Sequence, residues 1–167
     1  SGSQKAGIYI NGGTSGHNIL NNEIYGKGFS VEGWPGIIFG YNTSNINIKG
    51  NTITKWYQGI YINPSSNLTI ENNIISTNYV GIGSDGLNNV QIIGNTFSGN
   101  TSEAIGSSNV GTNVKINNNN FTGNTAGVNW YSGNKIDATM NWWGHHTGPS
   151  VTSNPLGSGD KISENIL

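Results

Sequence analysis

The chain lacks both cysteine and arginine, and only 9% of its 167 residues are charged. Without cysteine it has no disulfide framework and no thiolate site, so its stability has to come from hydrogen bonds and packing. Without arginine, no guanidinium group is present to clamp a phosphate or a uronate carboxylate in bidentate fashion. The formal net charge of -1 also gives no electrostatic reason to expect nucleic acid as a partner.

Long hydrophobic runs are missing as well. No stretch reaches the roughly 18 consecutive apolar residues that a membrane-spanning helix needs, so we expect no membrane span. Hydrophobic residues make up 33% of the chain, whereas glycine contributes 26 residues and asparagine is more frequent still. This composition is typical of short strands joined by turns rather than of a helical domain.

An internal repeat is what the sequence does contain. A glycine or alanine followed by alternating apolar residues recurs six times, starting at Gly7, Gly36, Gly59, Gly81, Ala104 and Gly127. A second marker, an asparagine with an apolar residue two positions later, holds a constant place in each repeat: Asn22, Asn51, Asn73, Asn95, Asn119 and Asn141. The two markers together define a period of about 22 residues, which indicates a solenoid.

Between the two markers, short segments such as Ile46-Asn47-Ile48 and Val90-Gln91-Ile92 alternate apolar and polar residues, as half-buried strands do. The sequence therefore predicts an all-β fold, a right-handed parallel β-helix of about six coils with three short strands per coil. The marker asparagines are expected at corners with positive φ, where their amides form a ladder from coil to coil. A leucine-rich repeat has a similar period but needs leucines at fixed offsets, and leucine is scarce here.

Residues 7–143 resemble the family of right-handed parallel β-helix repeat proteins, which includes periplasmic copper-binding-type and carbohydrate-active members. The segments from Asn45 to Ile53 and from Asn89 to Phe97 are similar to this repeat almost letter for letter. The resemblance implies the fold. It does not imply one activity, because lyases, epimerases, glycosidases, adhesins and plain spacers share that fold.

The end of the repeat region carries a second resemblance. Asp137-Ala138-Thr139, Trp142-Trp143-Gly144 and Gly148-Pro149 look like the closing segment of bacterial and archaeal surface β-helix proteins. This implies an extracellular or cell-surface location, often as one module of a larger chain. We expect residues 1–6 to form an N-terminal edge that carries a cloning remnant, residues 7–143 to form the coils of a monomer, and residues 144–167 to cap or leave them.

No two acidic residues occupy the same position of the repeat on neighbouring coils. Glu71 has Lys49 one coil away, and Asp85 lies between Asn63 and Ser108. Glycoside hydrolysis and lyase chemistry need two or more such groups within a few ångström of one another. The chain is therefore expected to lack catalytic residues.

Histidines and tryptophans near the ends of the repeat have structural interpretations. His17 occupies an inward position of the first coil, and His145 and His146 follow the tryptophan pair in a turn without a third ligand nearby. No metal site and no cofactor are expected. Trp130 and Trp143 share inward positions and are expected in the core and the cap.

Aromatic residues provide the candidate binding site. They precede the repeated glycine or point outward from the strand after it, and are expected to form one stripe of Trp34, Trp56, Tyr57, Tyr79, Tyr9 and Tyr61. An insertion between Tyr25 and Pro35, which contains Glu32, overhangs the stripe and completes the candidate set. Exposed aromatic rings bind the C–H faces of pyranose rings, while neighbouring amides and hydroxyls read the sugar hydroxyls.

The resulting hypothesis is a non-catalytic extracellular module that binds a polysaccharide or cell-wall glycan, or mediates cell-surface adhesion. One alternative is a structural spacer or surface-layer element, in which the aromatic rings only stack on one another. The other is a polysaccharide lyase or epimerase domain, which rests on fold analogy alone.

Overall fold

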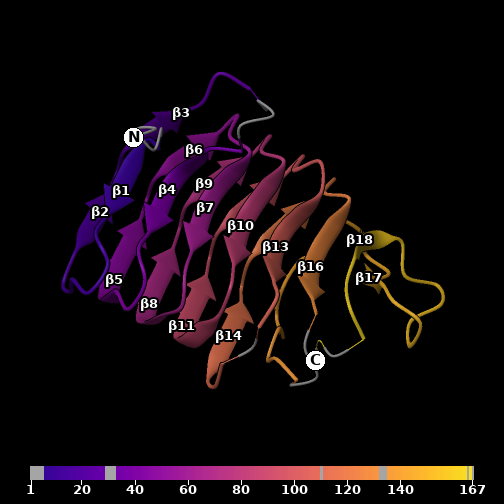
Figure 1. Cartoon of the computed structure of the whole chain (residues 1–167). Helices are drawn as coiled ribbons and strands as arrows, with labels where there is room; N and C mark the ends of the chain where they lie inside the picture. The colour runs from indigo at the N-terminus through magenta and orange to yellow at the C-terminus, as the bar shows by residue number, and fades with distance from the viewer. Residues whose placement is uncertain (1–5, 29–32, 110, 132–134, 165, 167) are drawn as a thin grey trace.

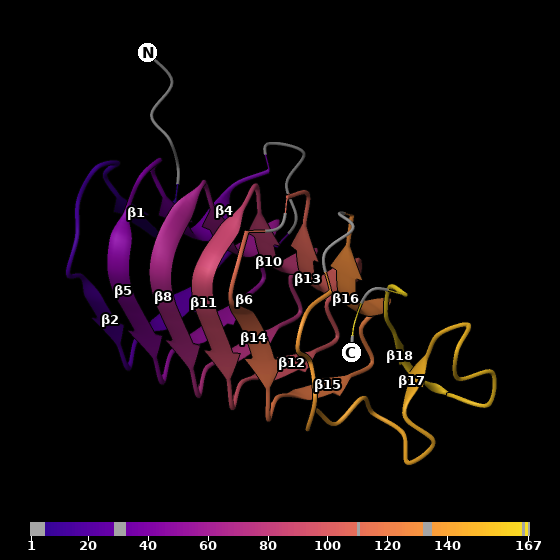
Figure 2. The same cartoon turned by 90° about the horizontal axis from the view of Figure 1, so that it is seen from below.

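The computed structural model describes residues 6–28, 33–109, 111–131, 135–164 and 166. Within these ranges the chain contains strands and no helix, and so no helix that could cross a membrane. Sixteen of the strands wind around one axis and stack in three parallel sheets, which Figures 1 and 2 show from two sides.

Each sheet takes one strand from every coil. Sheet A consists of β1 (Ile8–Ile10), β4 (Pro35–Phe39), β7 (Gln58–Ile62), β10 (Val80–Ser84), β13 (Glu103–Ser107) and β16 (Ala126–Trp130). Sheet B consists of β2 (Asn18–Leu20), β5 (Ser44–Lys49), β8 (Ser65–Glu71), β11 (Leu87–Ile93) and β14 (Val114–Asn117). Sheet C consists of β3 (Glu23–Tyr25), β6 (Thr52–Thr54), β9 (Ile74–Ser76), β12 (Thr96–Ser98) and β15 (Asn120–Thr122). The predicted parallel solenoid is confirmed.

The number of coils differs slightly from the six predicted. Sheet A has 6 strands, whereas sheets B and C have 5 each. The chain therefore completes five coils, and β16 begins a sixth. Beyond β16, the described residues of the sixth coil form single β-bridges to the fifth, Lys115 with Asp137 and Asn120 with Trp142, instead of continuous strands.

The core consists of columns of equivalent side chains. Ile37 pairs with Ile60, and Ile60 pairs with Ile82 on the next coil. All three are fully buried, as expected for the inward positions of short half-buried strands. The winding thus buries apolar surface that a single coil would leave exposed.

Aromatic rings close one of these columns at its C-terminal end. The rings of Phe97 and Phe121 stack with centroids 5.0 Å apart, and those of Phe121 and Trp143 with centroids 4.6 Å apart. Trp143 and Trp130 are both buried, so their predicted core and cap positions are confirmed.

The predicted asparagine ladder is present. The Asn51 amide donates to Asn73 Oδ1 at 3.0 Å, and the Asn73 amide donates to Asn95 Oδ1 at 2.9 Å. Each carbonyl oxygen also accepts a backbone N–H of the coil before, as Asn73 Oδ1 does from Asn51 at 2.9 Å. Because these side chains are about 1% exposed, the ladder satisfies corner groups that water does not reach.

The expectation of positive φ at the ladder asparagines was wrong by one residue. The left-handed conformation belongs to the residue just before each of them, with φ of 68° at Gly50, 54° at Asn72 and 67° at Gly94. That residue turns the corner, and the asparagine after it directs its amide inward to the ladder. Glycine and asparagine tolerate this conformation best.

A second buried ladder runs along the axis. Asn78 donates to Asn100 at 3.2 Å, and Asn100 donates to Asn124 at 2.8 Å. Asn124 in turn donates to Asp160 Oδ2 at 2.6 Å. The sequence analysis missed this ladder, although an asparagine precedes the repeated glycine or alanine in these three coils.

The chain after the last coil covers the C-terminal end of the solenoid. Strands β17 (Pro149–Ser150) and β18 (Gly159–Lys161) pair with each other, and they lie beside β16 in Figure 1. Ile162 bridges to Val128 and is buried against the core. The open edge of sheet A at β16 is thereby partly paired.

Replacing Asn73 with alanine should destabilise the fold by roughly 2–4 kcal/mol, because the change leaves buried donors and acceptors of the neighbouring coils unpaired. Asn67→Gly is the control, since Asn67 belongs to an exposed row and its φ of 57° suits glycine. This control should cost less than about 1 kcal/mol. Urea unfolding would measure both changes, and equal losses would contradict the structural role of the buried ladder.

Candidate functional site

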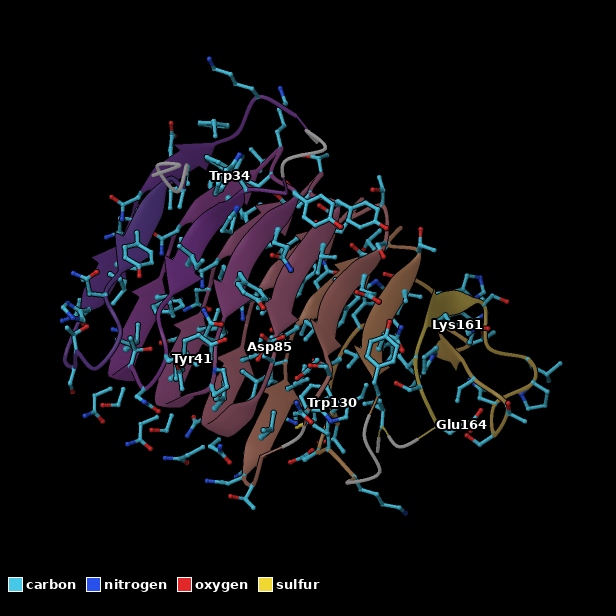
Figure 3. The ribbon with its side chains drawn as sticks, viewed as in Figure 1. Trp34, Tyr41, Asp85, Trp130, Lys161 and Glu164 are labelled. Atoms are coloured by element: carbon cyan, nitrogen blue, oxygen red, sulfur yellow. The ribbon has the colours of Figure 1, made fainter. Side chains whose placement is uncertain are left out.

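The candidate site lies on the outer face of sheet A. Figure 3 shows Trp34 at the margin where the strands of sheet A begin and Asp85 at the opposite margin, where they end. Outward-pointing side chains of successive coils form columns across this face. The strand register therefore decides which of the predicted residues come together.

Trp34, Tyr57 and Tyr79 occupy equivalent places on three consecutive coils, since the residues after them pair with one another. The rings of Tyr57 and Tyr79 stack with centroids 4.8 Å apart and an angle of 19° between their planes. A Cβ on Gly33 would lie 3.5 Å from the Tyr57 ring, so Tyr57 has neighbours on the coils before and after it. The faces that meet in the Tyr57–Tyr79 stack are not available to a sugar.

Trp56 does not join the stripe. Its indole Nε1 donates to the backbone oxygen of Ile24 at 3.1 Å, and the ring packs against the core. Its backbone N–H donates to Asn78 Oδ1 at 3.0 Å, which places Trp56 at the N-terminal start of the second asparagine ladder. The indole therefore fills the inside of the first coils.

Tyr9 and Tyr61 lie in one column, but they are not on neighbouring coils. Tyr9 pairs with Ile38 and Ile38 pairs with Tyr61, so an isoleucine separates the two tyrosines. Tyr9 is exposed and Tyr61 is half-buried. The column thus presents two aromatic rings to the outside with an aliphatic side chain between them.

The Tyr61 ring is held in a fixed position. Its hydroxyl donates to Asp85 Oδ2 at 2.6 Å, and a Cβ on Gly83 would lie 3.5 Å from the ring. The missing side chain at Gly83 leaves the room that the ring needs to cross to the next coil. Burial, followed by the hydrogen bond to Asp85 and the charge of that carboxylate, raises the pKa of the Tyr61 hydroxyl well above its ordinary value.

A hollow of about 170 Å³ adjoins this ring. Its wall includes Trp34, Pro35, Ile38, Gln58 and Tyr61. Of the predicted site residues, the structure brings Trp34 and Tyr61 together here. Aromatic and aliphatic surface beside one amide is a combination suited to a ring with C–H faces and hydroxyl groups.

The predicted set of binding residues differs from the residues that the structure places at the site. Glu32 lies outside the described residues. Tyr41 was missed, although it is 62% exposed and close enough to Tyr61 to contribute to the raised pKa of that residue. Gln58 and Asp85 were not predicted as binding residues either. Gln58 could have been found from the sequence, because it directly precedes the repeated Gly59 and so occupies the position that Pro35 has one coil earlier.

The charged residues and histidines that the structure describes form small local contacts. Lys49 and Glu71 form an exposed ion pair at 3.2 Å, as their positions in the repeat predicted. The rings of His145 and His146 lie 4.3 Å apart, and His145 Nδ1 bonds to the Thr147 hydroxyl at 2.8 Å. Over the described part of the chain, no three His, Cys, Asp or Glu residues form a group that could hold a metal ion.

Comparison with known families agrees with this architecture. The family model described as "right handed beta helix region" matches residues 1–142. The chain belongs to that family. No curated protein and no solved structure gives a match. The family establishes the fold, while the use of the outer face of sheet A has to be argued from its own residues.

The raised pKa of Tyr61 predicts a stability difference at high pH. The folded state holds the phenol proton more tightly than the unfolded chain, whose pKa is near 10.0. The stabilisation is therefore fully present below pH 10.0 and is lost as the pH rises through the higher folded value. Carbon-13 NMR of the Tyr61 ring should show that it ionises above pH 10.0.

Asp85→Asn serves as the matched variant, because it keeps an oxygen that can accept the phenol proton and removes the negative charge. It should lower the pKa of Tyr61 toward the ordinary value. A Tyr61 ring that ionises near pH 10.0 in the unmodified protein would contradict the described geometry.

Proposed function

We propose that this chain is a non-catalytic module that binds carbohydrate through the outer face of sheet A. The observation that carries the proposal is the Tyr61 ring, fixed by Gly83 and Asp85 beside a hollow that contains Trp34 and Gln58. Sugar recognition commonly combines an aromatic platform with polar groups that orient the hydroxyls, and all of these parts lie within three neighbouring coils.

Each part has a separate task in this proposal. The Tyr61 ring takes the apolar face of one pyranose, since C–H groups pack favourably on the negative face of an aromatic ring. The Gln58 amide can both donate to and accept from hydroxyl groups. The Asp85 carboxylate accepts from Tyr61 through Oδ2 and keeps further lone pairs on both oxygens for a hydroxyl of the ligand.

The shape of the face indicates how a glycan would lie. At about 170 Å³, the hollow is smaller than the roughly 300 Å³ at which enclosed small-molecule pockets begin. A single sugar ring would be held there, with its neighbours along the chain resting on the open face. Coils spaced by about 4.8 Å are close to the length of a sugar unit, so an extended glycan would run along the solenoid axis.

Rigid positioning favours binding in such a shallow site. The coils fix Tyr61 and Gln58 before any ligand arrives, so little side-chain entropy is lost on binding. Once one sugar unit is bound, its neighbours on the same polysaccharide are held close to the surface. Several weak contacts can therefore give a higher overall affinity than one contact alone. An extracellular location and a role in adhesion are part of this proposal and rest on the resemblance of the closing segment to surface proteins.

A structural spacer is the second candidate, and one observation favours it. Tyr57 and Tyr79 stack on each other, as expected where aromatic residues only stabilise a corner. In that case no variant of the outer face should alter any interaction of the protein. The two candidates therefore differ in what Tyr61 does, whereas Tyr57 is expected to stabilise the fold under both.

Affinity electrophoresis in gels containing cellulose, xylan, pectin or peptidoglycan fragments tests the proposal. The protein should be retarded by at least one polymer, and Tyr61→Ala should weaken that retardation by about tenfold, as the loss of a central aromatic contact does. Tyr25→Ala is the control, because Tyr25 is 58% exposed on sheet C and lies off this face. Unretarded migration with every polymer would support the spacer. Retardation that Tyr61→Ala leaves unchanged, or that both variants weaken equally, would contradict a binding site at Tyr61.

A further inference from the structure

The charge of the outer face of sheet A indicates which class of glycan suits it. The strands of this sheet are β1, β4, β7, β10, β13 and β16, and all of their residues are described. These strands contain no lysine, and their one charged residue is Glu103. A second acidic residue, Asp85, directly follows β10 at the margin of the face (Figure 3). The strands and this margin therefore carry negative charge.

The Asp85 carboxylate lies beside the Tyr61 ring that borders the hollow. Its Oδ2 accepts the Tyr61 hydroxyl at 2.6 Å. Burial contributes most to the raised pKa of that hydroxyl, and the hydrogen bond and the charge of Asp85 add to it. Burial and the Asp85 charge both act against a second negative charge at this ring, and they would act on the carboxylate of a bound sugar in the same way.

The hollow beside Tyr61 is lined by uncharged residues among those that the structure describes. The polar side chains in this lining belong to Trp34, Gln58 and Tyr61. Their N–H and O–H groups can bond to sugar hydroxyls, but they cannot neutralise a carboxylate. A uronate bound here would lose part of its hydration without gaining an ion pair, which costs free energy.

The column of residues that contains Tyr61 leads along the axis to another carboxylate. Tyr61 pairs with Gly83, and Gly83 pairs with Gly106 on the following coil. The Glu103 carboxylate lies over Gly106, because a Cβ there would be 2.6 Å from Glu103 Oε2. Its other oxygen, Oε1, accepts the Tyr131 hydroxyl at 2.7 Å and is held in place. A glycan that extends from the hollow along this column would therefore meet a second negative charge.

We propose that this face selects uncharged glycans and rejects polyuronates, with Asp85 as the residue that sets the specificity and Glu103 extending it along the axis. This selectivity rests on the proposed carbohydrate binding, for which it specifies the ligand. A sugar hydroxyl can donate a hydrogen bond to either carboxylate. A uronate carboxylate cannot donate one and carries the same charge, so it is excluded by repulsion.

Affinity electrophoresis with matched pairs of polymers tests this selectivity. Each pair shares one backbone and differs in its carboxylates: hydroxyethyl and carboxymethyl cellulose, xylan and glucuronoxylan, and methyl-esterified and de-esterified pectin. In any pair that retards the protein, the member with fewer carboxylates should bind at least about tenfold more tightly at low ionic strength.

The possible failures of this test are distinct. Equal or tighter binding of the acidic member would overturn the selectivity and leave carbohydrate binding intact. Failure of every uncharged member to retard the protein would also overturn the selectivity. Failure of all polymers, peptidoglycan fragments included, would overturn the proposed function as well.

Salt separates repulsion from a difference in shape. Sodium chloride screens like charges, so raising its concentration should strengthen binding of the acidic member and narrow the ratio within a pair. Isothermal titration of the unmodified protein with both members at low and high salt measures this ratio. A ratio that does not change with salt would contradict repulsion as its cause.

Charge variants locate the repulsion. Asp85→Asn keeps an oxygen that can accept from Tyr61 and should reduce the ratio from about tenfold to about threefold or less, whereas Glu103→Gln should reduce it by a smaller factor. Glu23→Gln is the control, because it removes the same charge from an exposed position on sheet C and should leave the ratio unchanged. An undiminished ratio in Asp85→Asn, or an equal reduction in Glu23→Gln, would overturn the assignment to Asp85.

Discussion

Stacking of one coil on the next is the constraint on which the rest of the structure depends. A coil cannot pair its own backbone groups in the sheets, so nearly every corner and strand has to bond to the coil before or after it. Asparagine solves this at the buried corners, because its side-chain oxygen accepts from the asparagine on the coil before and its side-chain N–H donates to the asparagine on the coil after. Two such ladders fix the coils in register, and that register determines which outward side chains share a column.

Glycines make room for long side chains on the outer face of sheet A. Tyr61 and Gln58 lie over Gly83 of the next coil, whereas Glu103 lies over Gly106 of its own strand. The glycines thus leave space that neighbouring side chains occupy in a fixed orientation, so the outer face of sheet A carries oriented groups on a rigid support.

The sequence predicted positions well and orientations poorly, for a physical reason. A constant period determines which residues share a column, and so the first ladder, the core columns and the Trp34–Tyr57–Tyr79 alignment could be derived from spacing. Rotamers determine what each side chain does in its column, and spacing contains no information on them. Trp56 therefore turned inward, Tyr57 and Tyr79 turned toward each other, and the contact of Tyr61 with Asp85 could not be foreseen.

The direction of the ladders explains why the C-terminal segment matters. In both ladders each amide donates toward the C-terminus, so the last member needs an acceptor that no further coil provides. Asp160 meets this need in the second ladder, since its carboxylate accepts from Asn124 and from the backbone of Gly123. Successive residues of a strand point to opposite sides, so the strand that buries Asp160 turns Lys161 outward to the surface. One short strand thus completes the interior hydrogen bonding and supplies a charged group to the surface.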